Sequence, residues 1–107
     1  MDPLANAILE YIRKNIKEDI TVKVLCSQFH ISANHLYNIF RSNLDRTVTQ
    51  YITEQRMNRA KELLLTSNDP VYAIAERVGI DNYTYFCRLF RKHNGFTPTQ
   101  YRKHVGK

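Results

Sequence analysis

Apolar residues recur along most of this chain at intervals of three and four positions, which is the spacing of an α-helix that buries one face. No segment alternates apolar and polar residues in the way that a half-buried strand does. The pattern predicts an all-α fold with seven helices. We expect these helices at about residues 4–16, 22–29, 33–43, 48–65, 71–78 and 82–94, with the seventh starting at about residue 98.

Residues that favour helix ends stand at the predicted boundaries. A hydroxyl side chain before a helix accepts a hydrogen bond from a free backbone N–H of the first turn. Four such residues precede predicted helices: Thr21, Ser32, Thr47 and Thr97. The two later ones are followed three positions on by glutamine, which predicts a capping box at each. We expect Asp69 to cap the fifth helix with Pro70 in its first turn, and Gly95 to end the sixth.

The chain also contains an internal repeat. The series Phe40, Arg41, Thr47, Thr49, Gln50 and Tyr51 returns fifty positions later as Phe90, Arg91, Thr97, Thr99, Gln100 and Tyr101. Each copy has a short helix, a tight turn and a longer helix ending in basic residues, which is typical of a helix-turn-helix. We therefore predict two helix-turn-helix subdomains, at residues 1–45 and 67–107, joined by a long linker helix at residues 46–66.

The longer helix of each copy has a predicted buried face and a polar face opposite to it. The inward residues are Leu36, Ile39 and Phe40 in the first copy and Phe86, Leu89 and Phe90 in the second. Helix geometry then turns the polar positions outward: Asn34, Tyr37, Asn38 and Arg41 in the first copy, and Tyr83, Thr84, Cys87, Arg88 and Arg91 in the second. Neither outward set contains a carboxylate.

These outward residue types are suited to contacts with DNA. Asn and Arg side chains form paired hydrogen bonds with adenine and guanine edges, and Thr and Tyr can contact a thymine methyl group. Arg88 is the sharpest candidate for a base contact, because it lies in the middle of its helix on the outward face. Arg41, Arg91 and Lys92, near helix C-termini, are candidates for contacts with DNA phosphates.

Each candidate has a second interpretation. Asn34 and Asn38 are also typical of a solvated surface, and Tyr37 of a residue that folds back onto the core. Cations at a helix C-terminus interact favourably with the helix dipole whether or not they bind phosphate. Cys87 fits an interface residue and a half-buried thiol equally well.

The charge of the chain favours a polyanionic partner. Its 107 residues have a formal net charge of +6 at pH 7, and no acidic residue follows Asn82. A one-sided basic field attracts nucleic acid through the release of counterions. A second class of function, a helical protein-interaction module with incidental basic charge, predicts DNA binding that is weak, independent of sequence and abolished by modest salt.

The sequence offers little for other functions. Its four histidines are scattered, and no metal-binding pattern of His and Cys, Gly-rich phosphate loop or other cofactor motif is present. We therefore expect neither an enzyme, nor a metal site, nor a cofactor. The two cysteines, Cys26 and Cys87, lie in separate copies without a CxxC pattern, which fits a reducing compartment. The lack of a signal peptide and of a long apolar run favours a cytoplasmic protein that does not enter a membrane.

These residues resemble the DNA-binding domain of AraC/XylS-type transcriptional regulators over nearly the whole chain, from about Leu4 to Lys103. The most specific matches in the second copy are Ile74-Ala75, Val78-Gly79-Ile80, Tyr85-Phe86, Arg88-Leu89-Phe90-Arg91-Lys92, Gly95, Thr97-Pro98 and Tyr101-Arg102. The linker helix matches at Tyr51-Ile52, Arg56-Met57, Ala60 and Leu63-Leu64.

The resemblance implies sequence-specific binding of double-stranded DNA and regulation of transcription, with two recognition helices in successive major grooves. A linker of about 28 Å is compatible with grooves about 34 Å apart. The base contacts that the resemblance implies fall on Asn34, Tyr37, Asn38, Tyr83, Thr84, Cys87 and Arg88. It further implies RNA polymerase as a partner, a monomeric isolated domain, and either a stand-alone regulator or the C-terminal part of a longer one, such as a two-component response regulator.

The first copy departs from the family pattern in four places. His30 stands where family members often have glycine, and Asp45 and Val48 replace the glycine and proline that the second copy keeps as Gly95 and Pro98. No arginine of the first copy matches Arg88. Because histidine tolerates a positive φ better than most residues, we expect the fold to be kept and the first subdomain to bind DNA more weakly.

Overall fold

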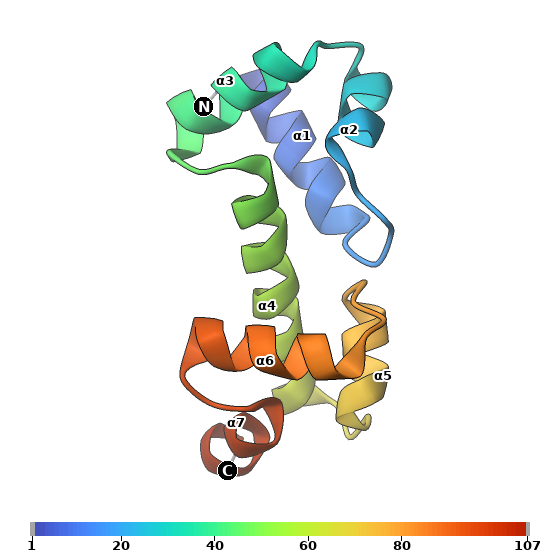
Figure 1. The fold of residues 1–107 in the computed structure, drawn as a ribbon, viewed down its shortest axis with the longest axis vertical. Helices are drawn as coiled ribbons and strands as arrows, with labels where there is room; N and C mark the ends of the chain where they lie inside the picture. Colours follow the sequence, from blue (N-terminus) through green and yellow to red (C-terminus); the bar gives the residue numbers. More distant parts are fainter. Residues whose placement is uncertain (1, 107) are drawn as a thin grey trace. The chain divides into compact units, whose positions relative to one another are not determined.

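The computed structural model describes residues 2–106, and these form seven α-helices and no strand (Figure 1). The helices are α1 (Pro3–Lys14), α2 (Val22–Phe29), α3 (Ala33–Leu44), α4 (Val48–Thr66), α5 (Val71–Arg77), α6 (Tyr83–Asn94) and α7 (Pro98–Val105). The predicted all-α fold with seven helices is confirmed for this part of the chain. The first helix ends two residues earlier than predicted, because Asn15 folds back onto it and donates to the Tyr11 carbonyl at 2.8 Å.

Most helix starts are set by the hydroxyl side chains that the sequence places there. Thr21 Oγ1 accepts from the Val24 N–H at 3.1 Å, and Ser32 Oγ accepts from the His35 N–H at 3.1 Å. Both predicted capping boxes form, at the starts of α4 and α7. In the second box, Thr97 Oγ1 accepts from the Gln100 N–H at 3.1 Å while Gln100 Oε1 accepts from the Thr97 N–H at 3.0 Å.

The start of α5 differs from its prediction. Pro70 itself occupies the N-cap position, and no side chain caps this helix. Asp69, the expected cap, accepts instead from Arg77 Nη1 at 2.8 Å. The ion pair with a residue eight positions away holds the carboxylate away from the first turn.

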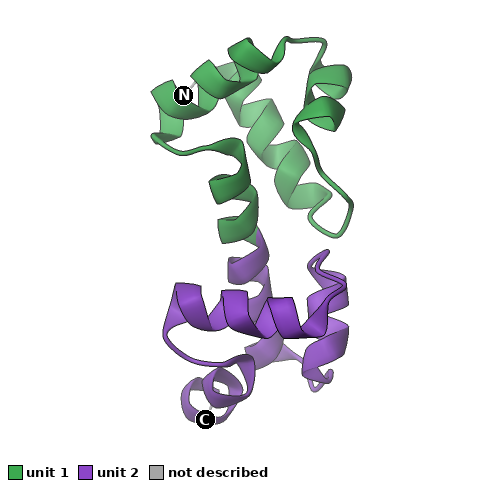
Figure 2. Ribbon diagram, in the orientation of Figure 1, with its two compact units in different colours: residues 1–55 green, residues 56–107 purple. Residues whose placement is uncertain are grey.

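The chain divides into two compact units, one up to Gln55 and one from Arg56 onward (Figure 2). Unit 1 contains α1, α2, α3 and the first part of α4, and unit 2 contains the rest of α4 with α5, α6 and α7. The boundary falls inside α4, so one continuous helix of 19 residues contributes a buried face to each unit.

Unit 1 packs around the buried side chains of α1, α2 and α3. Ile8, Ile12, Leu25 and Leu36 are fully buried, and all belong to one apolar cluster. The ring of Phe40, at the inner face of α3, meets the ring of Tyr51 edge-on at 5.7 Å between centroids. The Tyr51 hydroxyl leaves this core at its edge and accepts from Arg13 Nη1 at 3.1 Å.

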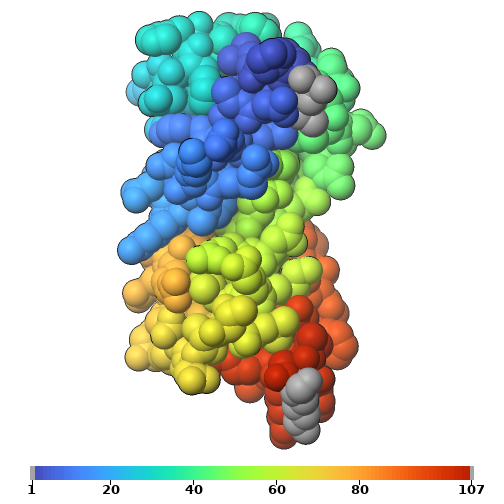
Figure 3. Space-filling model, turned by 180° about the vertical axis from the view of Figure 1, so that it is seen from behind, coloured from blue at the N-terminus to red at the C-terminus, as the bar shows by residue number. Residues whose placement is uncertain are grey.

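Unit 2 repeats this plan with the equivalent residues. The rings of Phe90 and Tyr101 meet edge-on at 5.6 Å, as their counterparts fifty positions earlier do. Phe86 and Phe90 of α6 are fully buried in one cluster with Ile74 of α5 and with Val78, which follows α5. Leu89, expected to point inward, is only partly buried at the edge of this core. α6 crosses the front of unit 2 in Figure 1, and Figure 3 shows the face behind it, formed mainly by α4, α5 and α7.

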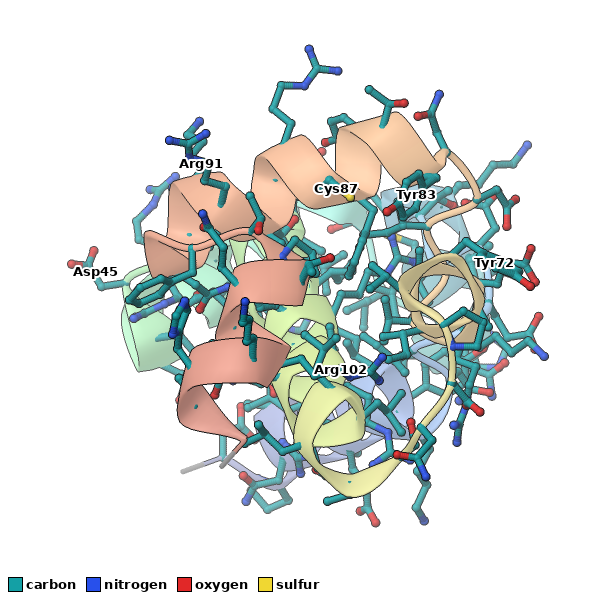
Figure 4. The ribbon with its side chains drawn as sticks, turned by 90° about the horizontal axis from the view of Figure 1, so that it is seen from below. Asp45, Tyr72, Tyr83, Cys87, Arg91 and Arg102 are labelled. Atoms are coloured by element: carbon teal, nitrogen blue, oxygen red, sulfur yellow. The ribbon has the colours of Figure 1, made fainter. Side chains whose placement is uncertain are left out.

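The C-terminal helix is tied to the end of α4 by a single arginine. Arg102 Nε donates to the Leu64 carbonyl at 3.0 Å, and its Nη2 donates to the Ser67 carbonyl at 3.2 Å. The Leu64 carbonyl belongs to the last turn of α4, where carbonyls accept no hydrogen bond within the helix, and Ser67 directly follows that helix. Figure 4 shows the Arg102 side chain lying against α4.

Candidate nucleic-acid interface

In each unit a tight turn sets the direction of the longer helix. His30 ends α2 with φ 55°, and the Ile31 N–H after it donates to the Cys26 carbonyl at 3.1 Å. Gly79 holds the equivalent place after α5 with φ 85°, and the Ile80 N–H donates to the Ala75 carbonyl at 2.9 Å. The left-handed conformation expected at His30 is confirmed. The two turns build the same helix-turn-helix, although one of them uses a residue for which this backbone is less favourable than for glycine.

The outward face of α3 is exposed as predicted. Asn34, Asn38 and Arg41 are exposed, and Tyr37 keeps 46% of its surface accessible. Tyr37 therefore stands at the surface and is not a satellite of the core. The buried face of the same helix consists of Leu36, Ile39 and Phe40, so its polar residues face outward, where solvent or a binding partner can reach them.

The outward face of α6 presents a larger and more basic set. Thr84, Arg88, Arg91 and Lys92 are exposed, and Tyr83 keeps 47% of its surface accessible. Cys87 is half-buried on the same face. Figure 4 shows Tyr83, Cys87 and Arg91 placed in this order along α6.

Two contacts organise the first turns of α6. The side chains of Tyr83 and Cys87 share a hydrogen bond, which raises the pKa of Tyr83; the electrostatic interaction with Cys87 and partial burial act in the same direction. The Arg88 guanidinium lies 6.0 Å from the centroid of the Tyr85 ring, at the outer range of a cation–π contact. Tyr85 is itself exposed, and the outward set derived from the sequence does not include it.

The structure adds a second element to each face, namely the start of the following helix. In unit 1 a shallow hollow is lined by Val22 of α2 and by Tyr37 and Arg41 of α3 together with residues 45–50. In unit 2 a hollow is lined by Cys87, Arg88, Arg91 and Lys92 of α6 together with Thr97. Asn34, Asn38, Tyr83 and Thr84 do not line either hollow.

From the sequence, Thr47 and Thr97 were expected only to cap helices. The repeated Thr-x-x-Gln box was the available signal, because it recurs at the same distance from Arg41 and Arg91. A capped helix start next to exposed arginines is chemically suited to an anion, since free backbone N–H groups and the helix dipole favour negative charge there.

Other kinds of site find no support in the part of the chain that the structure describes. Among residues 2–106, no three His, Cys, Asp or Glu side chains gather in an arrangement for a metal ion. None of the helices described is long and apolar enough to cross a membrane. Two helix-turn-helix units, each with an exposed and largely basic or amide-bearing second helix, define a DNA-binding domain.

Comparison with known proteins identifies the family. A family model that describes a helix-turn-helix domain matches residues 25–104. The C-terminal domain of AraT, a response regulator from Geobacillus stearothermophilus, superposes with a TM-score of 0.91 at 33% identity, over 95% of this chain and 85% of that chain. The DNA-binding domain of AdpA, solved in complex with a target DNA, superposes with a TM-score of 0.87 at 28% identity, over 96% and 92% of the two chains.

A curated relative agrees with these structures. The bifunctional transcriptional activator and DNA repair enzyme AdaA of Bacillus subtilis is 38% identical over 96 residues, which are 90% of this chain and 46% of AdaA. The chain belongs to the helix-turn-helix family of AraC-type DNA-binding domains, as its resemblance implied. It spans between about a third and a half of the length of the curated relatives AdaA, RafR and YisR.

Proposed function

We propose that this domain binds double-stranded DNA in a sequence-specific manner and thereby regulates transcription. The single observation that carries the proposal is the repeated exposed face of α3 and α6, which presents hydrogen-bonding and cationic side chains without a carboxylate. Membership of the AraC-type family and the likeness to a domain solved with its target DNA support the same function.

The two faces divide into two kinds of contact. The residues that we assign to base edges are Asn34, Tyr37, Asn38, Tyr83, Thr84, Cys87 and Arg88. Arg88 matches the paired acceptors of guanine, and the two asparagines match adenine. Arg41, Arg91 and Lys92, near the ends of their helices, bind phosphates and fix the register of the domain on the duplex.

The two recognition helices then enter successive major grooves, joined by the 19 residues of α4. As a transcription regulator the domain works with RNA polymerase on chromosomal DNA, in the cytoplasm of a bacterial cell. The isolated domain binds as a monomer, because its two recognition helices already supply the two contacts for which simpler helix-turn-helix proteins dimerise. Its likeness to the C-terminal domain of AraT supports a place at the end of a longer response regulator.

An affinity selection from random duplex DNA at about physiological salt tests the proposal. We expect enrichment of a defined sequence, which a labelled duplex of that sequence then binds more tightly than its scrambled version. Binding without enrichment, or binding that modest salt abolishes, would instead favour a protein-interaction module whose charge is incidental.

A further inference from the structure

We propose that Asp45 acts as an electrostatic brake on DNA binding by unit 1, an inference that rests on the proposed function. Asp45 ends α3 with φ 53° and ψ 43°, and it lines the hollow that Arg41 and Thr47 also line. At the equivalent position unit 2 has Gly95, with φ 79°. The carboxylate therefore stands in unit 1 beside the groups that face phosphate, and unit 2 has no counterpart for it.

Asp45 contributes little to the stability of its own surroundings. The left-handed backbone favours glycine over any residue with a Cβ atom. A negative charge at the C-terminal end of α3 also opposes the helix dipole. Among the residues that the structure describes, no partner pairs with the Asp45 carboxylate, and the neighbouring Arg46 instead donates to Glu54 Oε1 at 2.5 Å. Figure 4 shows the Asp45 side chain projecting away from the ribbon.

The hollow of unit 2 is also more positively charged than the hollow of unit 1. The hollow of unit 2 is lined by three cations, Arg88, Arg91 and Lys92, and by no carboxylate of the described chain. In unit 1 the cation Arg41 shares the hollow with the carboxylate of Asp45, and the second cation, Arg46, is paired with a glutamate.

The positions equivalent to Arg88 and Lys92 hold Asn38 and Ser42, which are neutral. The hollow of unit 1 thus offers phosphate little net positive charge, and Arg41 is its one cation without an acidic partner in the described chain. Most of the electrostatic attraction to the DNA backbone then comes from unit 2.

The test measures binding of the variant Asp45→Asn to a labelled duplex of the selected sequence, by fluorescence anisotropy over a series of salt concentrations. Asparagine tolerates the left-handed backbone as aspartate does, so the variant changes the charge and keeps the turn. We expect affinity to rise about two- to fivefold at low salt, with less gain as screening increases. The slope of log K against log salt should become steeper by up to about 0.9.

Two controls separate a local effect from net charge and from strain. Glu10→Gln makes the same change of charge on α1, where Glu10 is exposed and outside the hollow. The reciprocal variant Gly95→Asp places a carboxylate in unit 2 and is compared with Gly95→Asn, since both introduce the same strained backbone and a Cβ atom there meets no neighbour within 4 Å. We expect Gly95→Asp to bind more weakly than Gly95→Asn.

The outcomes are distinct. A gain in affinity for Asp45→Asn no larger than that for Glu10→Gln would overturn the inference about Asp45 and leave the proposed function intact. Equal affinities of Gly95→Asp and Gly95→Asn would also contradict it. A wild-type domain that binds no duplex would overturn the proposed function, and the inference with it, before any variant is compared.

Discussion

At the scale of single residues, the exposed face of α6 places side chains with different tasks within two turns of one another. Arg88 lies in the middle of the helix beside the Tyr85 ring, while Arg91 and Lys92 lie in its last turn, where the helix dipole favours cations. A guanidinium in the middle of a recognition helix can reach a base edge, and cations at its end reach the backbone of the duplex. The two roles make different predictions for substitution.

Removing the side chain of Arg88 should affect sequence recognition. We expect Arg88→Ala to lower affinity for the selected duplex by about 1–3 kcal/mol and to relax the preference at one base pair. The measurement is a titration against the selected duplex and against each single-base variant of it. An equal loss on every sequence would make Arg88 a phosphate contact.

Lys92 supplies the matched comparison on the same helix. Lys92→Ala should weaken all duplexes alike and reduce the slope of log K against log salt by about one unit, because one phosphate contact is lost. The readout is the same titration repeated over several salt concentrations. If the salt slope does not change, Lys92 lies outside the interface.

At the scale of elements, the fold depends on how helices start and stop. The capping box at the start of α7 holds the helix that packs against α6 through the Phe90–Tyr101 contact. We expect Thr97→Ala to lower the free energy of unfolding by about 0.5–2 kcal/mol, since the free N–H of Gln100 loses its acceptor. Urea denaturation measures it, with the exposed neighbour Thr99→Ala as the control. Equal effects of the two substitutions would argue against the cap.

The hydrogen bonds from Arg102 of α7 to the end of α4 should contribute to the stability of the fold, although Arg102 is partly exposed. Arg102→Ala leaves the carbonyls of Leu64 and Ser67 without their donor, and we expect a loss of about 1–2 kcal/mol in the free energy of unfolding. Lys103→Ala removes a neighbouring exposed cation and should change stability by less than about 0.5 kcal/mol. Denaturant unfolding compares the two, and similar losses would show that the hydrogen bonds contribute nothing specific.

The elements that the sequence predicted well are those decided by local chemistry. Thr21, Ser32 and the two capping boxes act on N–H groups three residues away, so their outcome follows from the neighbouring sequence alone. Asp69 was predicted wrongly because a residue eight positions away, Arg77, competes for its carboxylate. Leu89 fits the helical period of buried residues, but the core ends beside it.

The candidate site was predicted only in part, for a related reason. Helical periodicity turned the faces of α3 and α6 outward correctly, because burial of three apolar residues fixes the opposite side of a helix. Each hollow combines residues from different elements, as Arg41, Asp45 and Thr47 do in unit 1, and periodicity carries no such information. Tyr85 stands three positions before Arg88, a spacing that makes side chains neighbours on a helix, but it was not included in the predicted outward set.

Across the whole molecule, the same helical packing occurs twice, but the two copies expose different kinds of side chain. The buried residues repeat closely, from Phe40 and Tyr51 to Phe90 and Tyr101, whereas the exposed ones diverge toward amides in unit 1 and cations in unit 2. Burial constrains both copies to the same packing, while exposed positions are free to differ. We therefore propose that both units contact DNA, with most of the salt dependence in unit 2.

A hydroxyl-radical footprint of the domain on the selected sequence shows whether both recognition helices contact the duplex. We expect two clusters of protected positions on one face of the DNA, separated by about one helical turn of roughly 10.5 base pairs. The cluster assigned to unit 2 should survive at higher salt than the other. A single protected cluster at all salt concentrations would contradict this expectation and leave one unit without a role in binding.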